Sequence, residues 1–236
     1  KPRELNWLVG MCLLVCTLMV GFTGYSLVYE QLSYWGATVG ANISSSVPLV
    51  GEPMKRLLLG GDTYNESTLS RFFMLHAAIL PAVMVLLLIV HVSLIRVQGV
   101  TEFVDTKNPE KDRGSFNFFP DHLLTEIIMG LVLMILLAAL STSLPATMGP
   151  RADPLVTPEV IKPEWFFYVS FRWLKLFSGT VAVLSMGLIV FTMFIWPFID
   201  GAIHRRWPKS EFNIWIGILG VLSIIGLTIW EAVVAH

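Results

Sequence analysis

Long uninterrupted apolar runs dominate the pattern of this sequence. Five of them are each about 20 residues long, the length that an α-helix needs to cross the hydrocarbon layer of a membrane. They lie near Trp7–Leu27, Phe72–Ile95, Leu123–Leu144, Val181–Ile199 and Ile214–Val234. The sequence therefore predicts an all-α integral membrane protein with five transmembrane helices and with its two termini on opposite sides of the membrane.

The composition agrees with a membrane location. Of the 236 residues, 55% are hydrophobic and only 14% are charged, whereas roughly 25% of the residues in ordinary soluble domains are charged. The formal net charge of −1 offers no basic surface for nucleic acid, so DNA and RNA are excluded as partners. The first apolar run is too long for the apolar core of a signal peptide, so we interpret it as a membrane span.

Charges in the loops predict the orientation of the chain, because Lys and Arg are retained on the cytoplasmic side. With the N-terminus inside, the inner segments contain nine of the 16 Lys and Arg residues. These nine are Lys1, Arg3, Arg96, Lys107, Lys111, Arg113, Arg205, Arg206 and Lys209. By this small excess, the sequence predicts an inner N-terminus and an outer C-terminus. We expect the membrane to be the cytoplasmic membrane of a bacterium.

Two long segments connect the spans on the predicted outer side. In the first, 28–70, the segments Tyr34–Ala37 and Val47–Gly51 suggest short amphipathic helices on the membrane surface, with Trp35 at headgroup depth. The second, 143–178, contains several prolines before an aromatic run. Loops of this length are usually functional. We expect amphipathic surface helices in both of these outer loops.

Two histidines occupy the second span. His76 and His91 are the only ionisable side chains between Phe72 and Ile95, and such groups are costly in hydrocarbon unless they have a partner. Fifteen residues of helix rise about 22 Å and leave the pair within roughly 60° of one face. Since imidazole ligates haem iron, this spacing predicts two stacked haems. The alternative is two core histidines that hydrogen-bond across a helix bundle.

Two glycines in the first span have nearly the same spacing as the histidines. Gly10 and Gly24 are 14 residues apart, and glycine lets a flat macrocycle approach the helix backbone closely. Glycine also serves plain helix packing. Together, the paired glycines and paired histidines favour haem. In the second span, Pro81 is expected to produce a kink, because it removes the backbone hydrogen bond to the Ala77 carbonyl.

Glu164 is a candidate proton acceptor. It lies in Lys162-Pro163-Glu164-Trp165, where prolines and aromatic residues would partly desolvate the carboxylate and raise its pKa towards neutrality. The alternative is an interfacial carboxylate paired with Lys162. Tyr25, Trp35 and Phe166 can likewise be read as aromatic residues of the membrane interface.

Ordered motifs along the chain resemble the cytochrome b of bc-type complexes, in particular the two-chain arrangement of the cytochrome b6f complex. In residues 1–99 the matches are Pro2-Arg3-Glu4-Leu5-x-Trp7, Thr23-Gly24-Tyr25-Ser26-Leu27, Tyr34-Trp35, Pro48-x-Val50-Gly51, Thr68-Leu69-x-Arg71-Phe72, Leu75-His76, Leu80-Pro81, and His91 through Gln98-Gly99. In residues 116–236 they are Ala152-Asp153-Pro154, Thr157-Pro158 and Pro163-Glu164-Trp165.

The resemblance implies an organisation in three parts. Residues 1–99 correspond to the second half of the haem-binding N-terminal domain, with two transmembrane helices. Residues 100–120 form an inner linker. Residues 121–236 correspond to the C-terminal domain, similar to subunit IV of the b6f branch, with three transmembrane helices.

The resemblance also implies a function, that of a quinol–cytochrome c (or plastocyanin) oxidoreductase subunit, active only within its complex. Quinol is oxidised at an outer site, two b-type haems carry electrons across the membrane, and quinone is reduced at an inner site in a Q cycle. The implied metal ligands are His76 and His91, with Gly10 and Gly24 beside the haems. Glu164 takes a quinol proton.

Further roles follow from the same resemblance. The implied quinol pocket is shaped by Tyr25, Trp35, Gly36, Pro163, Trp165 and Phe166. Arg71 and Arg96 are expected to pair with haem propionates or with inner-site quinone, and the resemblance leaves open an additional haem near Arg96. The implied partners are a Rieske iron–sulfur protein, a c-type cytochrome and membrane lipid, in a dimeric complex.

The sequence departs from the family pattern in two ways. The two histidine ligands expected on an earlier helix are missing, so a separate polypeptide or a preceding segment must supply them, and we expect truncation or processing. Phe166 replaces the Tyr of the family's PEWY motif, so that hydroxyl is lost unless Tyr168 takes over its role.

Two other functions fit parts of the pattern. A transporter subunit could use its histidines as a proton relay. A haem-bearing membrane anchor of a dehydrogenase needs intramembrane histidines but neither long outer loop.

Overall fold

The computed structural model describes residues 3–99 and 117–234, and these residues are mainly helical. It confirms the five expected spans, which occupy Glu4–Leu27, Glu66–Gln98, Phe118–Ser143, Gly179–Arg206 and Phe212–Val233. Lys1, Pro2, Lys107, Lys111 and Arg113, together with most of the predicted inner linker, lie outside the described residues.

The chain divides into two units, which are described separately. One contains residues 100–149, and its described part is a π-helical turn, Phe118–His122, followed by α6, Leu123–Ser143. The side chains of α6 are exposed over nearly its whole length within this chain. The other unit contains residues 1–99 and 150–236. The predicted domain boundary between the linker and residue 121 stays a prediction.

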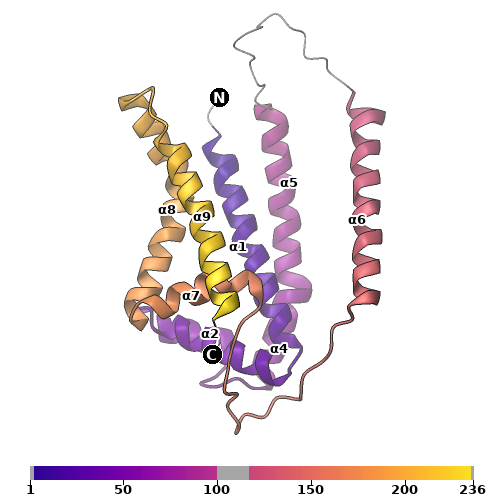
Figure 1. Cartoon of the computed structure of the whole chain (residues 1–236), viewed down its shortest axis with the longest axis vertical. Coiled ribbons are helices and arrows are strands. Elements are labelled where there is room, and N and C mark those ends of the chain that lie inside the picture. The colour runs from indigo at the N-terminus through magenta and orange to yellow at the C-terminus, as the bar shows by residue number, and fades with distance from the viewer. Residues whose placement is uncertain (1–2, 100–116, 235–236) are drawn as a thin grey trace, which may run out of the picture. The chain divides into compact units, whose positions relative to one another are not determined.

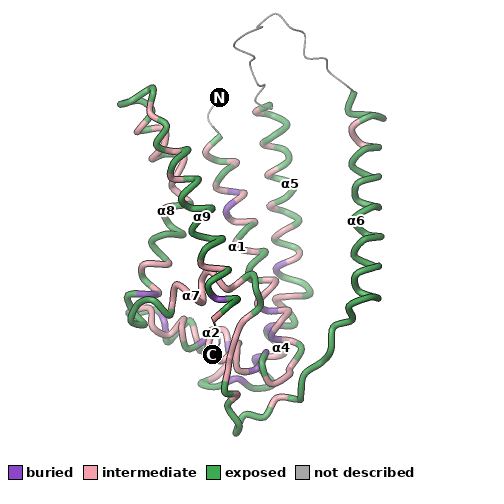
Figure 2. Tube along the Cα trace, viewed as in Figure 1, coloured by how far each residue is buried: buried purple, intermediate pink, exposed green. Residues whose placement is uncertain are grey.

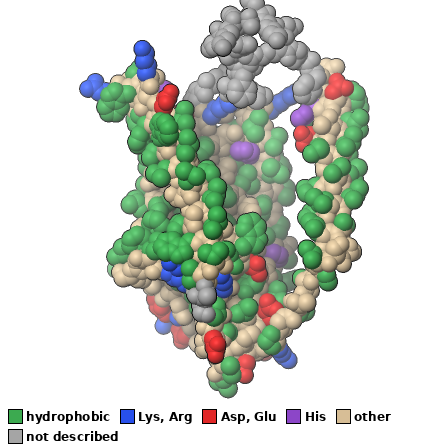
Figure 3. All heavy atoms as spheres, viewed as in Figure 1, with side chains coloured by type: hydrophobic (Ala, Val, Ile, Leu, Met, Phe, Trp, Pro, Cys, Tyr) green, Lys and Arg blue, Asp and Glu red, His purple; other side chains and the backbone are tan. Residues whose placement is uncertain are grey.

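Four long helices run alongside one another in the larger unit (Figure 1). They are α1 (Glu4–Leu27), α5 (Leu80–Gln98), α8 (Gly179–Arg206) and α9 (Phe212–Val233). Helix α1 packs against both α5 and α8. Hydrophobic side chains cover the visible surface of α8 and α9, while charged side chains gather towards the two ends (Figure 3). This distribution suits helices that face lipid.

Shorter helices gather at one end of the larger unit, which we call the loop end (Figure 1). They are α2 (Gln31–Ser45), α3 (Gly51–Leu59), α4 (Glu66–Met74) and α7 (Tyr168–Leu176). Helix α2 and helix α7 confirm the expected surface helices in the two long loops. The charged ends of α1, α5 and α8 lie at the opposite end (Figure 1), so several charges assigned to the inner side share one end of the unit.

Most fully buried residues lie at the loop end and along α1 (Figure 2). A buried cluster joins α2, α3 and α4 and consists of Tyr34, Ala37, Ala41, Leu59, Tyr64 and Phe72. The Tyr64 hydroxyl donates a hydrogen bond of 2.9 Å to the Ser26 carbonyl at the end of α1. Burial raises the pKa of Tyr64 to about 12, in keeping with an enclosed hydroxyl. The cluster therefore fixes the loop end to α1.

The second expected surface helix begins later than the sequence suggested. Residues Val47–Val50 form a turn, and α3 starts at Gly51. A Cβ atom at residue 51 would lie 2.5 Å from the Ser45 carbonyl oxygen, so glycine permits the close approach of α3 to the end of α2. Pro48 lacks a backbone N–H for helix continuation. The prediction of helix was therefore wrong at Val47–Val50 and right at Gly51.

The second span contains a wide turn at His76. Helix α4 leads into a π-helical turn, Leu75–Ile79, and then into α5, so the span continues from Glu66 to Gln98. The Leu80 N–H donates to the Leu75 carbonyl, five residues earlier. Pro81 cannot donate to Ala77, and the π turn next to it accommodates this missing hydrogen bond. Such turns are frequent at functional sites.

A second proline is accommodated by a contact between the two halves of the sequence. Pro197 lies inside α8 and has no N–H for the carbonyl of Met193, four residues earlier. The indole Nε1 of Trp7, in α1, donates a hydrogen bond of 2.7 Å to that carbonyl. Trp7 thus satisfies the acceptor that the proline leaves open.

Replacing Trp7 with Phe should lower the free energy of unfolding by about 1 kcal/mol, because it removes this donor. The loss should be smaller in a Pro197→Ala background, where the residue 197 N–H can bond to Met193. Reversible unfolding in mixed micelles measures both losses. Trp215→Phe, at an indole side chain that is 64% exposed, is the control and should have little effect. Equal losses for Trp7→Phe in the two backgrounds would contradict the explanation.

Candidate functional site

His76 lies against Gly24 of α1. A Cβ atom at residue 24 would lie only 2.5 Å from Cε1 of the His76 ring, so no other residue fits this position without displacing the imidazole. The ring Nδ1 is 3.1 Å from the Val20 carbonyl oxygen and 3.3 Å from the Thr23 hydroxyl. One side of the ring is therefore fixed by α1.

The hydrogen bonds around His76 define which ring nitrogen remains available. The Thr23 hydroxyl donates to the Met19 carbonyl at 2.8 Å, so its oxygen can accept from His76. The Val20 carbonyl is an acceptor only. Both neighbours of Nδ1 thus favour a proton on Nδ1, which leaves the Nε2 lone pair for a metal.

His91 repeats this arrangement at the other glycine. A Cβ atom at Gly10 would lie 3.4 Å from Cε1 of the His91 ring. Nδ1 of His91 is buried and has no hydrogen-bond partner among the described residues. Buried polar atoms normally have a partner, so this nitrogen is unexplained by the described protein atoms. Gly24 with His76 and Gly10 with His91 form two levels between α1 and the second span.

The π turn helps both histidines to face α1. In a regular α-helix, 15 residues leave two side chains roughly 60° apart. A π turn has more residues in each turn, so the chain rotates less between His76 and His91. Among the described residues, no group of three or more His, Cys, Asp or Glu side chains is placed to hold a metal ion. Each level therefore offers one imidazole, which suits a cofactor with axial ligands from two helices.

A cavity of about 200 Å³ lies at the loop end between α2, α7 and the segment before α7. Its lining is almost entirely apolar. The lining residues are Phe22, Gly36, Val39, Gly40, Ile43, Ile161, Pro163, Phe167, Ser170, Phe171, Leu174 and Met186. Gly36 and Pro163 are the two expected pocket residues among them. An apolar cavity with few polar groups is typical of a site for a small hydrophobic ligand.

The other expected pocket residues lie in different places. Tyr25 contacts Gly36, where a Cβ atom would be 3.3 Å from the Tyr25 ring. Phe166 packs on α1, since a Cβ atom at Gly21 would lie 3.1 Å from the Phe166 ring. Trp165 is 68% exposed, and the indole nitrogen of Trp35 is buried without a partner among the described residues. Tyr25 thus contacts α2 and Phe166 contacts α1. The cavity lining does not include Tyr25, Trp35, Trp165 or Phe166.

Glu164 is exposed, so the expected partial desolvation of its carboxylate is not found. It precedes the 3₁₀ turn Trp165–Phe167, in a segment that does not fold over it. The described residues contain no ion pair between Glu164 and Lys162. The Lys162 ammonium lies instead 3.4 Å from the Ala232 carbonyl oxygen and 5.1 Å from the centre of the Tyr168 ring. Glu164 is near enough to Tyr25 to act on its hydroxyl electrostatically.

The two arginines lie at opposite ends of the second span. Arg71, in α4, donates a hydrogen bond to the Leu57 carbonyl and thereby holds the end of α3. Arg96 is exposed in the last turn of α5. Their pairing with haem propionates or quinone stays a prediction.

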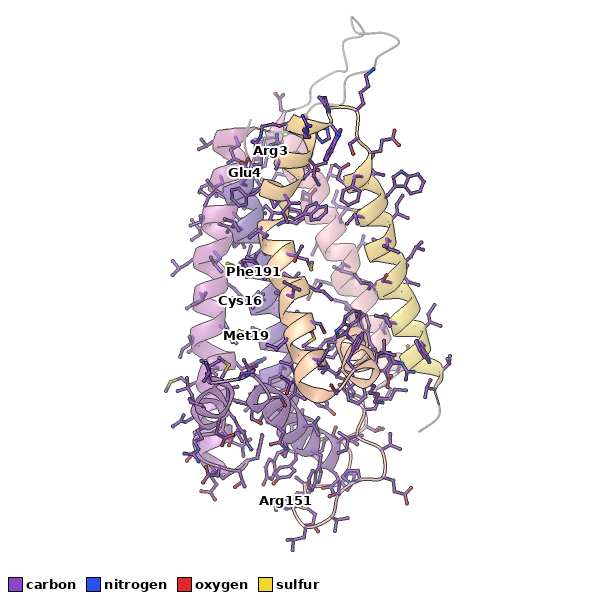
Figure 4. All side chains as sticks on the ribbon, turned by 90° about the vertical axis from the view of Figure 1, so that its left-hand side faces the viewer. Arg3, Glu4, Cys16, Met19, Arg151 and Phe191 are labelled. Carbon is purple, nitrogen blue, oxygen red and sulfur yellow. The ribbon has the colours of Figure 1, made fainter. Side chains whose placement is uncertain are left out.

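The second long loop is joined to the start of α2. Glu30 and Arg151 form an antiparallel bridge, and the Gln31 N–H donates to the Pro150 carbonyl at 2.8 Å. The Gln31 amide oxygen accepts from the Asp153 N–H at 2.6 Å. Figure 4 shows Arg151 at the loop end, far from Arg3 and Glu4 at the other end. These bonds help to hold the segment that leads to Pro163 beside α2.

Sequence reasoning missed most of the cavity lining. The missed residues are Phe22, Val39, Gly40, Ile43, Ile161, Phe167, Ser170, Phe171, Leu174 and Met186. One signal was available: Gly36 and Gly40 are four residues apart and share one face of α2. A Cβ atom at Gly40 would lie 2.9 Å from the Phe22 ring, so this face must accept aromatic rings from α1.

Comparisons with known proteins agree with this geometry. A family model described as cytochrome b (N-terminal)/b6/petB matches residues 1–151, and one described as cytochrome b (C-terminal)/b6/petD matches residues 151–235. The chain is 35% identical over 225 residues to a cytochrome bc complex cytochrome b subunit of Chlorobaculum thiosulfatiphilum, which covers 93% of this chain and 52% of that protein. It is 51% identical over 102 residues to cytochrome b6 of Heliobacterium mobile, covering 43% of this chain and 48% of that protein.

A solved structure supports the fold. A chain of a hyperthermophilic respiratory Complex III matches with a TM-score of 0.74 and 25% identity, covering 100% of this chain and 64% of that chain. This chain spans about half the length of the curated relatives named above. Because the first family model alone matches more than half of the sequence, and five helices are long and apolar enough to cross a membrane, the chain belongs to the cytochrome b family of integral membrane proteins.

Proposed function

We propose that this chain is part of the quinol-oxidising cytochrome b of a quinol–cytochrome c (or plastocyanin) oxidoreductase. One observation carries the proposal: His76 and His91 each lie against a glycine of α1, at two levels of one helix pair. A histidine that only relays protons has no need of glycine beside its ring. The apolar cavity at the loop end supports a quinol site, which a simple haem-bearing anchor does not require.

In this proposal, His76 and His91 would each hold one of two b-type haems, and Gly24 and Gly10 would leave room for the macrocycles. Haems bound at the two levels would supply one-electron carriers between the two sides of the membrane. The residues present fit this group, since Nδ1 of His76 faces backbone and hydroxyl oxygens and its Nε2 remains available. Another segment or subunit would supply the remaining haem ligands.

The cavity at the loop end would hold the quinol ring between α2 and α7. Gly36 and Pro163 line it, and Tyr25 and Phe166 pack beside it. Oxidation of quinol releases two electrons and two protons. Glu164 is exposed just before the 3₁₀ turn, and in this proposal it would pass a proton towards water. Without a Tyr hydroxyl at residue 166, Phe166 contributes packing only.

The complete reaction needs partners that accept the electrons. One electron passes to a Rieske iron–sulfur protein and then to a c-type cytochrome, and the other crosses the membrane to reduce quinone at an inner site near Arg96. The loop end then faces outwards and the N-terminus lies inside. The assembled complex is a dimer in membrane lipid, and the proton uptake inside and release outside make up a Q cycle.

A direct test measures cytochrome c reduction by a quinol analogue in the purified complex. We expect turnover that depends on quinol and is blocked by inhibitors of the outer quinol site. A complex that carries haem but shows no quinol-dependent turnover would favour the dehydrogenase anchor, and a complex without haem would favour the transporter subunit.

Replacing Glu164 with Gln should slow quinol oxidation by about tenfold or more, because the side chain can no longer accept a proton. The reduced-minus-oxidised haem spectrum should not change. Glu159→Gln, at an exposed carboxylate of the same loop, is the matched control and should retain turnover. Equal rates in the two variants would remove Glu164 from the proton path.

Replacing Gly24 with Ala should remove one of two b-type haem signals. The new Cβ atom would lie 2.5 Å from the His76 ring, whereas a Cβ atom at Gly217, in α9, would meet no neighbouring atom within 4 Å among the described residues. We therefore expect Gly217→Ala to retain both haems, which makes it the matched control. Quantitative reduced-minus-oxidised spectroscopy measures the haem content. Full haem content in Gly24→Ala would show that the close approach at this level is unimportant.

A further inference from the structure

A fully buried carboxylate lies in the last turn of α9. Glu231 has an exposed fraction of 0%, and its Oε1 lies 3.1 Å from Nζ of Lys175. Its Oε2 lies 3.7 Å from a guanidinium nitrogen of Arg172. Both cations come from α7. Because a buried charge is costly unless it is paired, Glu231 strongly favours one placement of α7 against α9.

Two further contacts hold α7 in this placement. The Arg172 guanidinium lies over the ring of Trp230, 3.8 Å from its centre, so it contacts α9 twice. The Trp173 indole nitrogen donates to the Ser185 hydroxyl of α8 at 3.0 Å. Helix α7 is thus fixed to both long helices of the second half of the chain.

The adjoining side of α7 lines the cavity. Ser170, Phe171 and Leu174 contribute to its wall. The ammonium of Lys175, which pairs with Glu231, lies 4.1 Å from the centre of the Phe171 ring. A change in the position of Lys175 therefore acts directly on a lining residue.

Ala232, the next residue of α9, contacts the segment before α7, which forms another part of the cavity wall. Lys162 lies between Ile161 and Pro163, both of which line the cavity. Its ammonium lies 3.4 Å from the Ala232 carbonyl oxygen. Residues 231 and 232 thus contact both segments of the second loop that enclose the cavity, although neither residue touches the cavity itself.

We propose that Glu231 is a positioning residue for the quinol cavity, acting through Lys175 and Arg172 on the cavity-lining side of α7. This inference rests on the proposed function. The proposal gives α9 a role in quinol affinity, although no residue of α9 is among the cavity-lining residues. The alternative is a contact that only stabilises the fold.

The test uses Glu231→Gln in the assembled complex, with KM and kcat for a quinol analogue and the dissociation constant of a quinone analogue as readouts. We expect KM and the dissociation constant to rise about tenfold, with kcat at saturating quinol changed less than about twofold and with intact haem spectra. Glu211→Gln, at the exposed start of the same helix, is the matched control and should retain wild-type values.

Two substitutions at Lys175 keep the proposal testable if Glu231→Gln does not fold. Lys175→Arg keeps the charge and should retain a near-normal KM, whereas Lys175→Met should raise it. A complex that loses thermal stability in Glu231→Gln or Lys175→Met but keeps the wild-type KM would overturn the proposal and leave only a structural role. Failure of the proposed function is distinguishable, because the wild type and Glu211→Gln would then also show no quinol oxidation.

Discussion

The contact between imidazole rings and glycine on α1 is the constraint on which the rest of the structure depends. A polar side chain in a membrane span needs a partner, and α1 gives His76 a backbone carbonyl at 3.1 Å and a place for its ring at Gly24. The His91 ring lies against Gly10, although its Nδ1 has no hydrogen-bond partner among the described residues. One pair of helices thereby sets two levels, and the π turn before Pro81 lets one span present both rings to the same neighbour.

Helix α1 also contacts the segments that enclose the cavity at the loop end. Phe22 of α1 contacts Gly40 of α2, and both residues line the cavity. Gly21 contacts Phe166, the neighbour of the lining residue Phe167. The helix that receives His76 therefore also helps to position two walls of the cavity. The third wall is α7, and the buried Glu231 of α9 holds it through an ion pair with Lys175. Segments distant in the sequence thus meet around Phe22, two residues before Gly24, and the proposed function needs such closeness between the quinol cavity and the His76 level.

The long spans, the two histidines and their glycine partners could be predicted from the sequence, because each depends on local periodicity and on the cost of polar groups in hydrocarbon. The start of α3 at Gly51 and the exposure of Glu164 could not, since both depend on how a loop closes over its neighbours. Glu231 was missed because its cations lie on a different element, 56 residues away in the case of Lys175. Only tertiary structure brings these residues together.

The most direct measurement is redox potentiometry of the b-type absorbance in the assembled complex, for the wild type and for His76→Leu and His91→Leu. The account predicts two b-type components in the wild type, with a different one missing from each variant. A wild-type complex without b-type absorbance, or a variant that keeps both components, would contradict the account.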